Sequence, residues 1–381
     1  MRLRRLLIGL LAAASLFSCK GRGDVVAVDT NGVADTVAVD TVPRCSVTFI
    51  MGHDNSAYNR YYEMAGHYYR MNADDRTDVV VDDLTSLSQV LDWLRAHPDT
   101  VNHRPYGLIN LVSHGNEFVD LQMTVTPRGA RTSPESLRQA LEQQLVVPPD
   151  SSLVDSLTVV FLHGCAVGQN QALLDRLAEA FGGRATVMAS KLFEYYAYLS
   201  RNRNPQSLRH YYARTWYAFH HPDSAVDNSQ LARQLKRRYP ADKVRWDEGL
   251  HRRFQDNPAQ IYHYSFTVPC TYEYFYAPDE PMPSFNSRRR RQQWVEQNAE
   301  FRQLLAQSHV PEEYFQIRFY RQTGLNDDGQ TVQGLKVKAR AGVICLIQPL
   351  VCTDSTGCTY APQRPADNDT SIFSFSRKRM G

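Results

Sequence analysis

The feature that most constrains this chain is an apolar run at residues 157–168, LTVVFLHGCAVG, in which Cys165 is followed at once by small residues. A run of this length, rich in β-branched and aromatic residues, is typical of a buried strand in a parallel sheet. Residues 169–182 then carry apolar side chains at helical spacing, which predicts the helix that crosses back over the sheet. Cys165 is therefore expected at the carboxyl edge of the sheet, where open α/β folds bind their ligands.

A second apolar run of the same form lies upstream. Residues 106–112, YGLINLV, lead directly into Ser113-His114-Gly115. Cys165 and His114 thus each follow a predicted strand, and a thiol with an imidazole is the minimum set for a cysteine nucleophile and its acid–base partner. The alternative is that His114 is an ordinary core or loop histidine whose hydrogen bonds are satisfied.

The alternation of strand and helix patterns predicts the fold class. Five segments have the character of strands, namely residues 46–51, 78–81, 106–112, 157–162 and 185–189. Helical patterns lie between them at residues 57–70, 84–97, 134–145 and 169–181. This order is typical of an α/β fold with a doubly wound, mostly parallel sheet flanked by helices. Residues 120–126 alternate in polarity and are expected to form a short hairpin arm over the sheet.

The C-terminal half has weaker patterns. Strands are expected at residues 261–276, 315–322 and 333–351, a helix at 294–307, and a hairpin turn around Asn326-Asp327-Asp328-Gly329. This β-rich region either completes the sheet or forms a small second domain, and residues 361–381 are expected to be a loose tail. The predicted organisation is a leader (1–19), a linker (20–45), a catalytic core (46–200) and a C-terminal region (201–381).

The N-terminus has the pattern of an export signal. Arg2, Arg4 and Arg5 precede an apolar segment at residues 6–16, which is too short to span a bilayer. Ser18-Cys19 at its end is similar to the bacterial lipobox, which implies a lipid on Cys19, although Phe17 is unusual in that motif. Cleavage without lipid is the alternative. The expected location is the bacterial cell envelope, outside the cytoplasm and attached to the membrane through this lipid.

The linker at residues 20–45 contains a near-repeat, DVVAVDT against DTVAVDT, and is expected to hold the folded part away from the membrane. An edge strand is the alternative interpretation of this repeat. With 43 basic and 40 acidic side chains, the chain carries no charge excess that would indicate a nucleic-acid partner.

The cysteines allow disulfides if the protein is exported. Besides Cys19 the chain has six: Cys45, Cys165, Cys270, Cys345, Cys352 and Cys358. An even number could pair completely, which is the structural alternative to a catalytic Cys165. A small loop bridge is expected between Cys352 and Cys358, and the remaining pairing stays open.

His114-Gly115 after one buried strand and Gly164-Cys165 after the next resemble the dyad of the caspase-like (clan CD) cysteine peptidases. Their separation of about 50 residues matches the caspase pattern. Residues 49–55, FIMGHDN, and 187–190, VMAS, are similar to the first and fifth strands of the clostripain-related branch. The resemblance covers residues 46–199 and implies an endopeptidase of caspase-like fold that acts on peptide or protein substrates and uses no metal or organic cofactor.

The resemblance also implies roles for individual residues. Cys165 would attack the scissile carbonyl and His114 would protonate the departing amine. The backbone N–H groups of Gly115 and Cys165 would bind the oxyanion, and glycine allows the substrate to approach closely.

One position departs from the family pattern. Related enzymes carry an acidic residue two positions before the cysteine, where this chain has His163. Alternate residues of a strand face the same way, so His163 is expected beside Cys165 in the pocket for the P1 side chain. This disfavours Arg or Lys at P1 unless another residue supplies the acid. The candidates for that acid are Glu117, Asp120 and Glu194, and further substrate-pocket candidates are Asp54 and Ser190.

Other interpretations stay open. His163 could itself be the working imidazole, or it could bind a metal together with Cys165 and His114. The basic run at residues 288–291 is expected to be an exposed loop, which could serve as a processing site. The alternative function is a catalytically inactive caspase-like surface lipoprotein that binds a protein or glycan partner.

Overall fold

The computed structural model describes residues 44–55, 60–73, 78–100, 102–198, 204–253, 261–277, 279–325, 329–349 and 372–377. Several predicted features lie outside this part of the chain: the leader with Cys19, the linker up to residue 43, and the bridge between Cys352 and Cys358. Within the described ranges, no helix is both long and apolar enough to cross a bilayer.

The N-terminal part forms an α/β unit around a sheet with the strand order β13–β7–β6–β3–β1–β2. Neighbouring strands are parallel except β13, which runs antiparallel to β7. The strands are β1 (Ser46–Ile50), β2 (Asp78–Val81), β3 (Leu108–Val112), β6 (Val159–His163), β7 (Thr186–Ser190) and β13 (Phe373–Ser376). The predicted mixed α/β class with a largely parallel sheet is confirmed. Each predicted core strand is present within two residues at either end.

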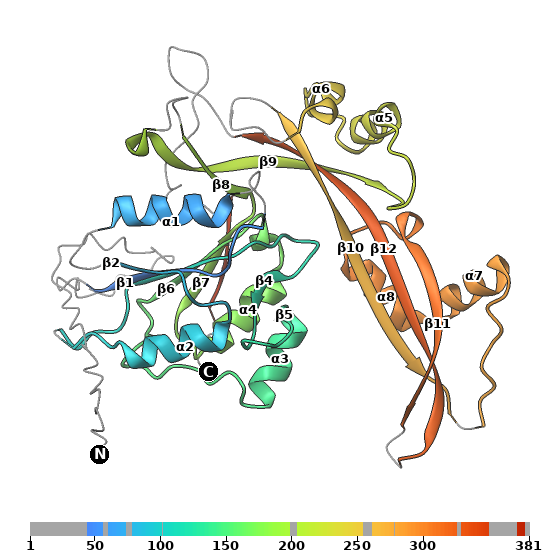
Figure 1. Cartoon of the computed structure of the whole chain (residues 1–381), viewed down its shortest axis with the longest axis horizontal. Coiled ribbons are helices and arrows are strands. Elements are labelled where there is room, and N and C mark those ends of the chain that lie inside the picture. Colours follow the sequence, from blue (N-terminus) through green and yellow to red (C-terminus); the bar gives the residue numbers. More distant parts are fainter. Residues whose placement is uncertain are drawn as a thin grey trace, which may run out of the picture.

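Helices cover both faces of this sheet (Figure 1). The first helix, α1 (Tyr61–Asn72), packs on one face, while α2 (Leu87–Ala96), α3 (Pro134–Glu142) and α4 (Gln171–Ala180) pack on the other. The sheet has one apolar core on each face, and alternate residues of a strand belong to different cores. Val160 and Leu162 face α2–α4, whereas Phe161 faces the side of α1. A short ribbon of β4 (Leu121–Thr124) and β5 (Arg131–Thr132) forms the predicted hairpin arm.

The starts of these helices follow from local chemistry. Ser86 and Gln89 form a reciprocal capping box at α2, which satisfies amide groups that the first turn leaves unpaired. Ser133 caps α3 in the same way, and Pro134 fits the first helical position because its missing N–H is not needed there.

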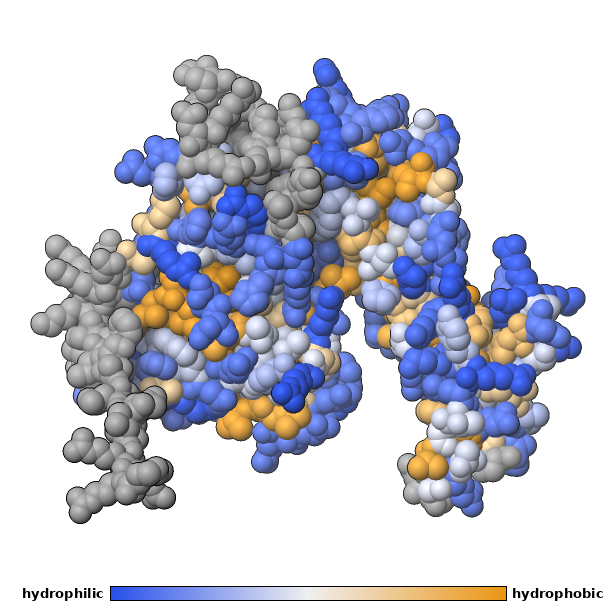
Figure 2. Space-filling view, in the orientation of Figure 1, coloured by the Kyte–Doolittle hydropathy of each residue, from blue (hydrophilic) through white to orange (hydrophobic). Residues whose placement is uncertain are grey.

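The C-terminal half forms a second, antiparallel sheet that extends away from the α/β unit as an arm (Figure 1). Its strands are β8 (Phe193–Tyr198), β9 (Leu208–His220), β10 (Tyr262–Phe275), β11 (Gln316–Leu325) and β12 (Thr331–Pro349). Alternate residues of β12 face two cores, with α7 (Arg288–Gln297) and α8 (Ala299–Gln307) on one side and α5 (Asn228–Arg238) and α6 (Trp246–His251) on the other. The outer surface in this view is largely hydrophilic, and the lower end of the arm stands apart from the α/β unit (Figure 2).

The two units join where β8 and β9 pass over the face of the first sheet that α1 also covers. Residues from α1, β8 and β9 share one apolar cluster with Ile50 and Val112. Because β8 starts at Phe193, the second sheet begins before the predicted domain boundary at residue 200. The C-terminal region was expected either to complete the first sheet or to form a second domain. Most of its described residues build a separate sheet, and β13 adds an edge strand to the first one.

Two predictions for the C-terminal half were wrong. The expected loose tail contributes the edge strand β13, because Phe373 is buried against Phe161 and Tyr212. The expected basic loop at residues 288–291 is the first turn of α7, capped by the Ser287 side chain. Its side chains are exposed as expected, because the buried contact of α7 comes from Val295.

The structure shows which of the described cysteines are bonded in a disulfide and which are free. Cys165, Cys270 and Cys345 are free thiols, whereas Cys45 is disulfide-bonded. Complete pairing, which was the structural alternative to a reactive Cys165, is therefore not what the structure shows.

We predict that packing of the last strand, β13, contributes measurably to the free energy of unfolding. Phe373→Ala should lower the free energy of unfolding by about 3–5 kcal/mol, as expected for truncating a buried phenylalanine. Ser374→Ala, in the same strand but half-buried, should change it by less than about 1 kcal/mol. Urea unfolding followed by circular dichroism measures both values. Equal, small losses for the two variants would contradict the packing of β13.

Candidate active site

Parallel pairing of β3 with β6 brings the two predicted motifs together. Val112 is opposite His163, and just beyond it the Ser113 N–H donates to the His163 carbonyl over 2.9 Å. The Cys165 N–H in turn donates to the Gly115 carbonyl over 3.0 Å. The segments that carry His114 and Cys165 therefore leave the sheet side by side at its carboxyl edge, as the sequence predicted.

His114 lies in an aromatic setting provided by α1. Its ring is 4.7 Å from the Tyr61 ring and 4.6 Å from the Tyr62 ring, measured between centroids. The Tyr62 hydroxyl accepts the His114 backbone N–H over 2.9 Å. These contacts hold both the backbone and the ring of His114, so its imidazole has a defined orientation.

Asp54 is the acidic partner of this imidazole rather than the substrate-pocket residue that was predicted. Its Oδ1 lies 3.8 Å from His114 Nε2, and its carboxylate also accepts the backbone N–H groups of Tyr62 and Glu63 in the first turn of α1. Burial raises the pKa of Asp54, but His114 and the two N–H donors outweigh it and hold the pKa below its usual range. Asp54 is therefore ionised, and its carboxylate lies next to the imidazole of His114.

Cys165 follows β6 in a tight turn. Ala166 has the left-handed φ of 56°, and the backbone then packs so closely that a Cβ on Gly168 would lie 2.4 Å from the Ala189 carbonyl oxygen. The thiol donates to the Glu194 carbonyl, with Sγ 3.6 Å from the oxygen. The turn and this contact orient the sulfur toward the junction of the two sheets, where it packs with apolar residues of the arm.

The surroundings of this thiol favour its neutral form. Burial raises the pKa of Cys165 well above its usual range, and the nearby carboxyl groups of Glu194 and Glu117 raise it further. The Tyr61 ring contacts His114 and the Tyr61 side chain lies near Cys165, so one side chain adjoins both residues of the predicted dyad. In the described conformation Cys165 is a thiol, not a preformed thiolate.

The predicted oxyanion site is incomplete in this conformation. The Cys165 N–H already donates to the Gly115 carbonyl, so it is not available to a substrate oxygen. For the Gly115 N–H, no hydrogen bond is found within the described residues. The expectation that both groups stand ready as donors is therefore wrong for this state, because the two segments satisfy one of the donors between themselves.

Glu117, one of the predicted pocket residues, is a buried acid near the thiol. Its side chain lies beside the Tyr217 hydroxyl, and burial raises its pKa to about 7, an effect that Tyr217 only partly offsets. Asp120, the second possible acid, is exposed in the loop before β4. Glu117 therefore lies near Cys165, whereas Asp120 is an exposed residue whose carboxyl pKa is raised by partial desolvation.

His163 occupies the predicted face of β6 but does not stand open beside the thiol. Its Nδ1 lies 2.8 Å from Glu194 Oε2, and its Nε2 lies 2.8 Å from the Tyr69 hydroxyl. His210 Nε2 lies 2.9 Å from the same Glu194 oxygen. His163 is thus grouped with Glu194 and His210, and the predicted metal set of His163 with Cys165 and His114 does not form.

Ser190 is not a pocket residue. It is fully buried at the end of β7, where its Oγ accepts the Leu192 N–H over 2.9 Å and shapes the turn into β8. Because β13 pairs beside it, Ser190 lies within the core at the junction of the sheets.

Sequence reasoning missed three residues that build this site: Tyr61, Tyr62 and His210. The two tyrosines were part of a predicted helix with no expected role. His210 was in a segment with no predicted element, although an ionisable residue within the aromatic run LRHYYARTWYAFH could have indicated it. His163 and His210 also line a cavity of about 300 Å³ between α1, the first sheet and β9, which does not include Cys165 among its lining residues.

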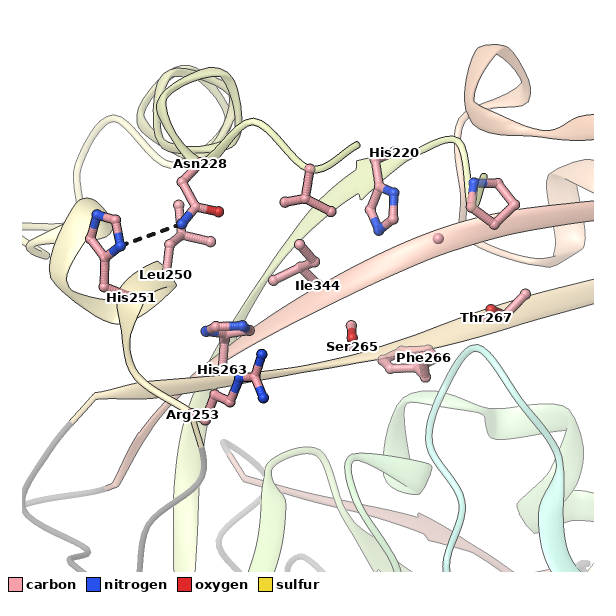
Figure 3. A pocket seen from close by; sticks show the side chains of 13 residues that line it. His220, Asn228, Leu250, His251, Arg253, His263, Ser265, Phe266, Thr267 and Ile344 are labelled. Atoms are coloured by element: carbon pink, nitrogen blue, oxygen red, sulfur yellow. Dashed lines mark hydrogen bonds between the residues drawn. The ribbon is translucent and has the colours of Figure 1, made fainter. Parts of the chain in front are cut away.

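A separate cavity of about 520 Å³ lies in the arm, between β9, β10, β12 and the helices α5 and α6 (Figure 3). His220, His263 and Arg253 point toward it, and Asn228 donates to His251 at its rim over 3.5 Å. None of its described lining residues is acidic. Its lining shares no residue with the site around His114 and Cys165.

Comparisons with known proteins returned nothing: no family model, no curated protein and no solved structure matches this chain.

We predict a pH-dependent stability that originates at Glu117. A carboxyl whose pKa rises from 4.5 to about 7 on folding stabilises the folded state below pH 4.5 and loses this contribution as the pH rises through 7. The loss is at most about 3 kcal/mol. Unfolding curves of Glu117→Gln at pH 5 and pH 8 should therefore differ less than those of the unaltered chain.

Glu313→Gln, at an exposed position, is the matched control and should leave the pH dependence unchanged. If Glu117→Gln keeps the full pH dependence of the unaltered chain, Glu117 is not the group that causes it.

Proposed function

We propose that this protein is a cysteine endopeptidase of caspase-like fold that cleaves peptide bonds with Cys165 and His114. The observation that carries this proposal is the side-by-side exit of the His114 and Cys165 segments from the third and fourth strands of a largely parallel sheet. Asp54 behind His114 supports it, because an ionised carboxylate stabilises the imidazolium that forms when the thiol is deprotonated.

The chemistry follows from these positions. His114 accepts the proton of the Cys165 thiol, and the sulfur attacks the carbonyl carbon of the scissile bond. His114 then donates this proton to the departing amine, which leaves a thioester on Cys165. Water hydrolyses the thioester, releases the acid product and restores the thiol.

Catalysis requires a local rearrangement. Two hydrogen bonds of the half-buried Cys165 describe a resting state: its thiol donates to the Glu194 carbonyl, and its N–H donates to the Gly115 carbonyl. Binding of a peptide has to break this hydrogen bond, so that the Cys165 N–H can join that of Gly115 at the developing oxyanion. In the same movement the sulfur turns from the Glu194 carbonyl toward the substrate.

The charges near the thiol favour particular substrates. The Glu194 carboxylate is already in contact with the imidazoles of His163 and His210, and a pKa of about 7 leaves Glu117 partly protonated at neutral pH. Neither acid therefore offers a full free carboxylate to a basic side chain. We expect acidic, amide or small side chains at P1 rather than Arg or Lys.

The decisive experiment is cleavage of a mixed-sequence peptide library by the full chain in detergent, read by mass spectrometry. Cuts should appear with the unaltered protein and disappear with Cys165→Ala. Cys270→Ala, at a buried free thiol in β10, is the matched control and should retain them. Cuts that persist in Cys165→Ala would exclude this residue as the nucleophile.

Asp54 provides a second test. Asp54→Asn keeps one of the two oxygens that accept N–H groups of α1 and removes the charge about 4 Å from His114, worth roughly 1–2 kcal/mol in the transition state. We expect kcat to fall roughly 5–30-fold with little change in KM. Asp83→Asn, at an exposed position after β2, should change neither value. An unchanged kcat in Asp54→Asn would remove Asp54 from the mechanism.

A second function is favoured by the buried thiol itself. A neutral Cys165, packed against the arm with its N–H already paired, also fits a caspase-like protein that has no activity and binds a protein or glycan partner. The library experiment separates the two. If neither the unaltered chain nor Cys165→Ala cleaves, also after proteolytic nicking in the 288–291 run, and both remain folded, the binding function replaces the peptidase.

The proposed location is the bacterial cell envelope, outside the cytoplasm, with the chain attached to the membrane by a lipid on Cys19. This proposal rests on the charged start, short apolar segment and Ser18-Cys19 motif of the leader.

A further inference from the structure

Three side chains of metal-ligating type converge between the two sheets. His163 at the end of β6, Glu194 in β8 and His210 in β9 place one ligand atom each within 4.8 Å of one another. The first strand belongs to the α/β unit and the other two belong to the arm. The cluster therefore lies at the junction on which the relative position of the two units depends.

The cluster is almost completely removed from water. The Glu194 side chain is 0 % exposed, and those of His163 and His210 are 3 % and 10 % exposed. An isolated buried carboxylate is strongly unfavourable, so this anion requires a cation beside it. Burial raises the pKa of Glu194, but the two imidazoles outweigh this effect and keep the group ionised.

The hydrogen bonds of His163 show which of its nitrogens faces the carboxylate. Its Nδ1 lies 2.8 Å from Glu194 Oε2. On the far side of the ring, Nε2 lies 2.8 Å from the Tyr69 hydroxyl and 3.1 Å from Asn110 Oδ1, and Asn110 itself donates to Thr48 Oγ1 over 3.0 Å. A metal ion bound to Nδ1 and Glu194 would take the place of a proton shared between them.

A second observation points to a ligand at the same place. Glu194 Oε1 is buried and has no hydrogen-bond partner within the described part of the chain. Buried polar atoms in proteins are almost always satisfied, so this oxygen has an unused coordination or acceptor position. The cavity of about 300 Å³ that His163 and His210 line adjoins the cluster and offers space for a bound water.

We propose that His163, Glu194 and His210 bind a divalent transition-metal ion, with Zn²⁺ as the reference ion. Two imidazoles with one carboxylate are a donor set that Zn²⁺ accepts, and a water from the cavity supplies the fourth ligand. Ligand distances of about 2.0–2.1 Å around a tetrahedral ion require Glu194 Oε2 to move a few tenths of an ångström farther from His163 Nδ1 and His210 Nε2, which now lie 2.8 Å and 2.9 Å away. Asn110 and Tyr69 hold the far nitrogen of His163, as outer partners of metal-bound histidines commonly do.

The metal would join β6 of one sheet to β8 and β9 of the other. The Glu194 carbonyl also accepts the Cys165 thiol, so occupancy of this site would fix the backbone that positions the sulfur. The proposal does not depend on peptidase activity, because neither Cys165 nor His114 is a ligand.

The test is the metal content of the full chain after treatment with a chelator, dialysis against Zn²⁺ and removal of excess metal. About one ion per chain should be retained, and Zn²⁺ should raise the temperature of unfolding. His163→Gln combined with His210→Gln should lose both effects. Cys165→Ser and His251→Gln, the latter at an exposed histidine of the arm, should retain them. Retention of the ion by the double variant, or no ion in the unaltered chain, overturns the proposal.

A second measurement covers the case in which the double variant does not fold. Co²⁺ bound to the unaltered chain in place of Zn²⁺ should give the visible absorption of a four-coordinate ion with nitrogen and oxygen ligands. A thiolate-to-cobalt charge-transfer band should be absent. Such a band would place the ion on a cysteine and overturn the assignment, as would the absence of any spectrum beyond that of Co²⁺ in buffer.

Discussion

The parallel pairing of β3 with β6 is the constraint on which the candidate site depends. Its register sets Val112 opposite His163, and the hydrogen bonds continue past the ends of the strands to Gly115 and Cys165. The imidazole and thiol are held together by this backbone ladder rather than by a contact between their side chains. The same ladder occupies the Cys165 N–H, so the pairing that brings His114 and Cys165 to one edge of the sheet also engages a donor that the proposed oxyanion site would need.

The arm contributes to this site as much as the α/β unit does. Glu194 in β8 presents its carbonyl to the Cys165 thiol and its carboxylate to His163, while apolar residues of the arm enclose the sulfur. Burial raises the pKa of the thiol, whereas on the other side the Asp54 carboxylate lies 3.8 Å from the His114 imidazole. The reactivity of Cys165 therefore depends on how tightly the two sheets pack at their junction.

Local sequence patterns predicted the α/β unit well because its strands are continuous apolar runs and its helices have strong caps. They failed where burial depends on distant partners. Phe373 lies in a short segment whose neighbours do not indicate a strand, and only its contact with Phe161 and the edge of β7 makes it one. The start of α7 was predicted six residues too late, because four arginines form its first turn and its single buried residue, Val295, comes later. The nearness of Asp54 to His114 was not predicted, because it follows from the adjacency of β1 and β3.

The sequence by itself determined the order of strands and helices in the α/β unit and the placement of His114 and Cys165 at strand ends, because hydrophobic periodicity and turn residues act over a few neighbouring positions. Only the tertiary structure decided the protonation of the thiol, the pairing of Asp54 with His114, and the convergence of His163, Glu194 and His210 from three strands. These depend on burial and on pairing between segments far apart in the chain, and no local pattern specifies which distant strands will meet.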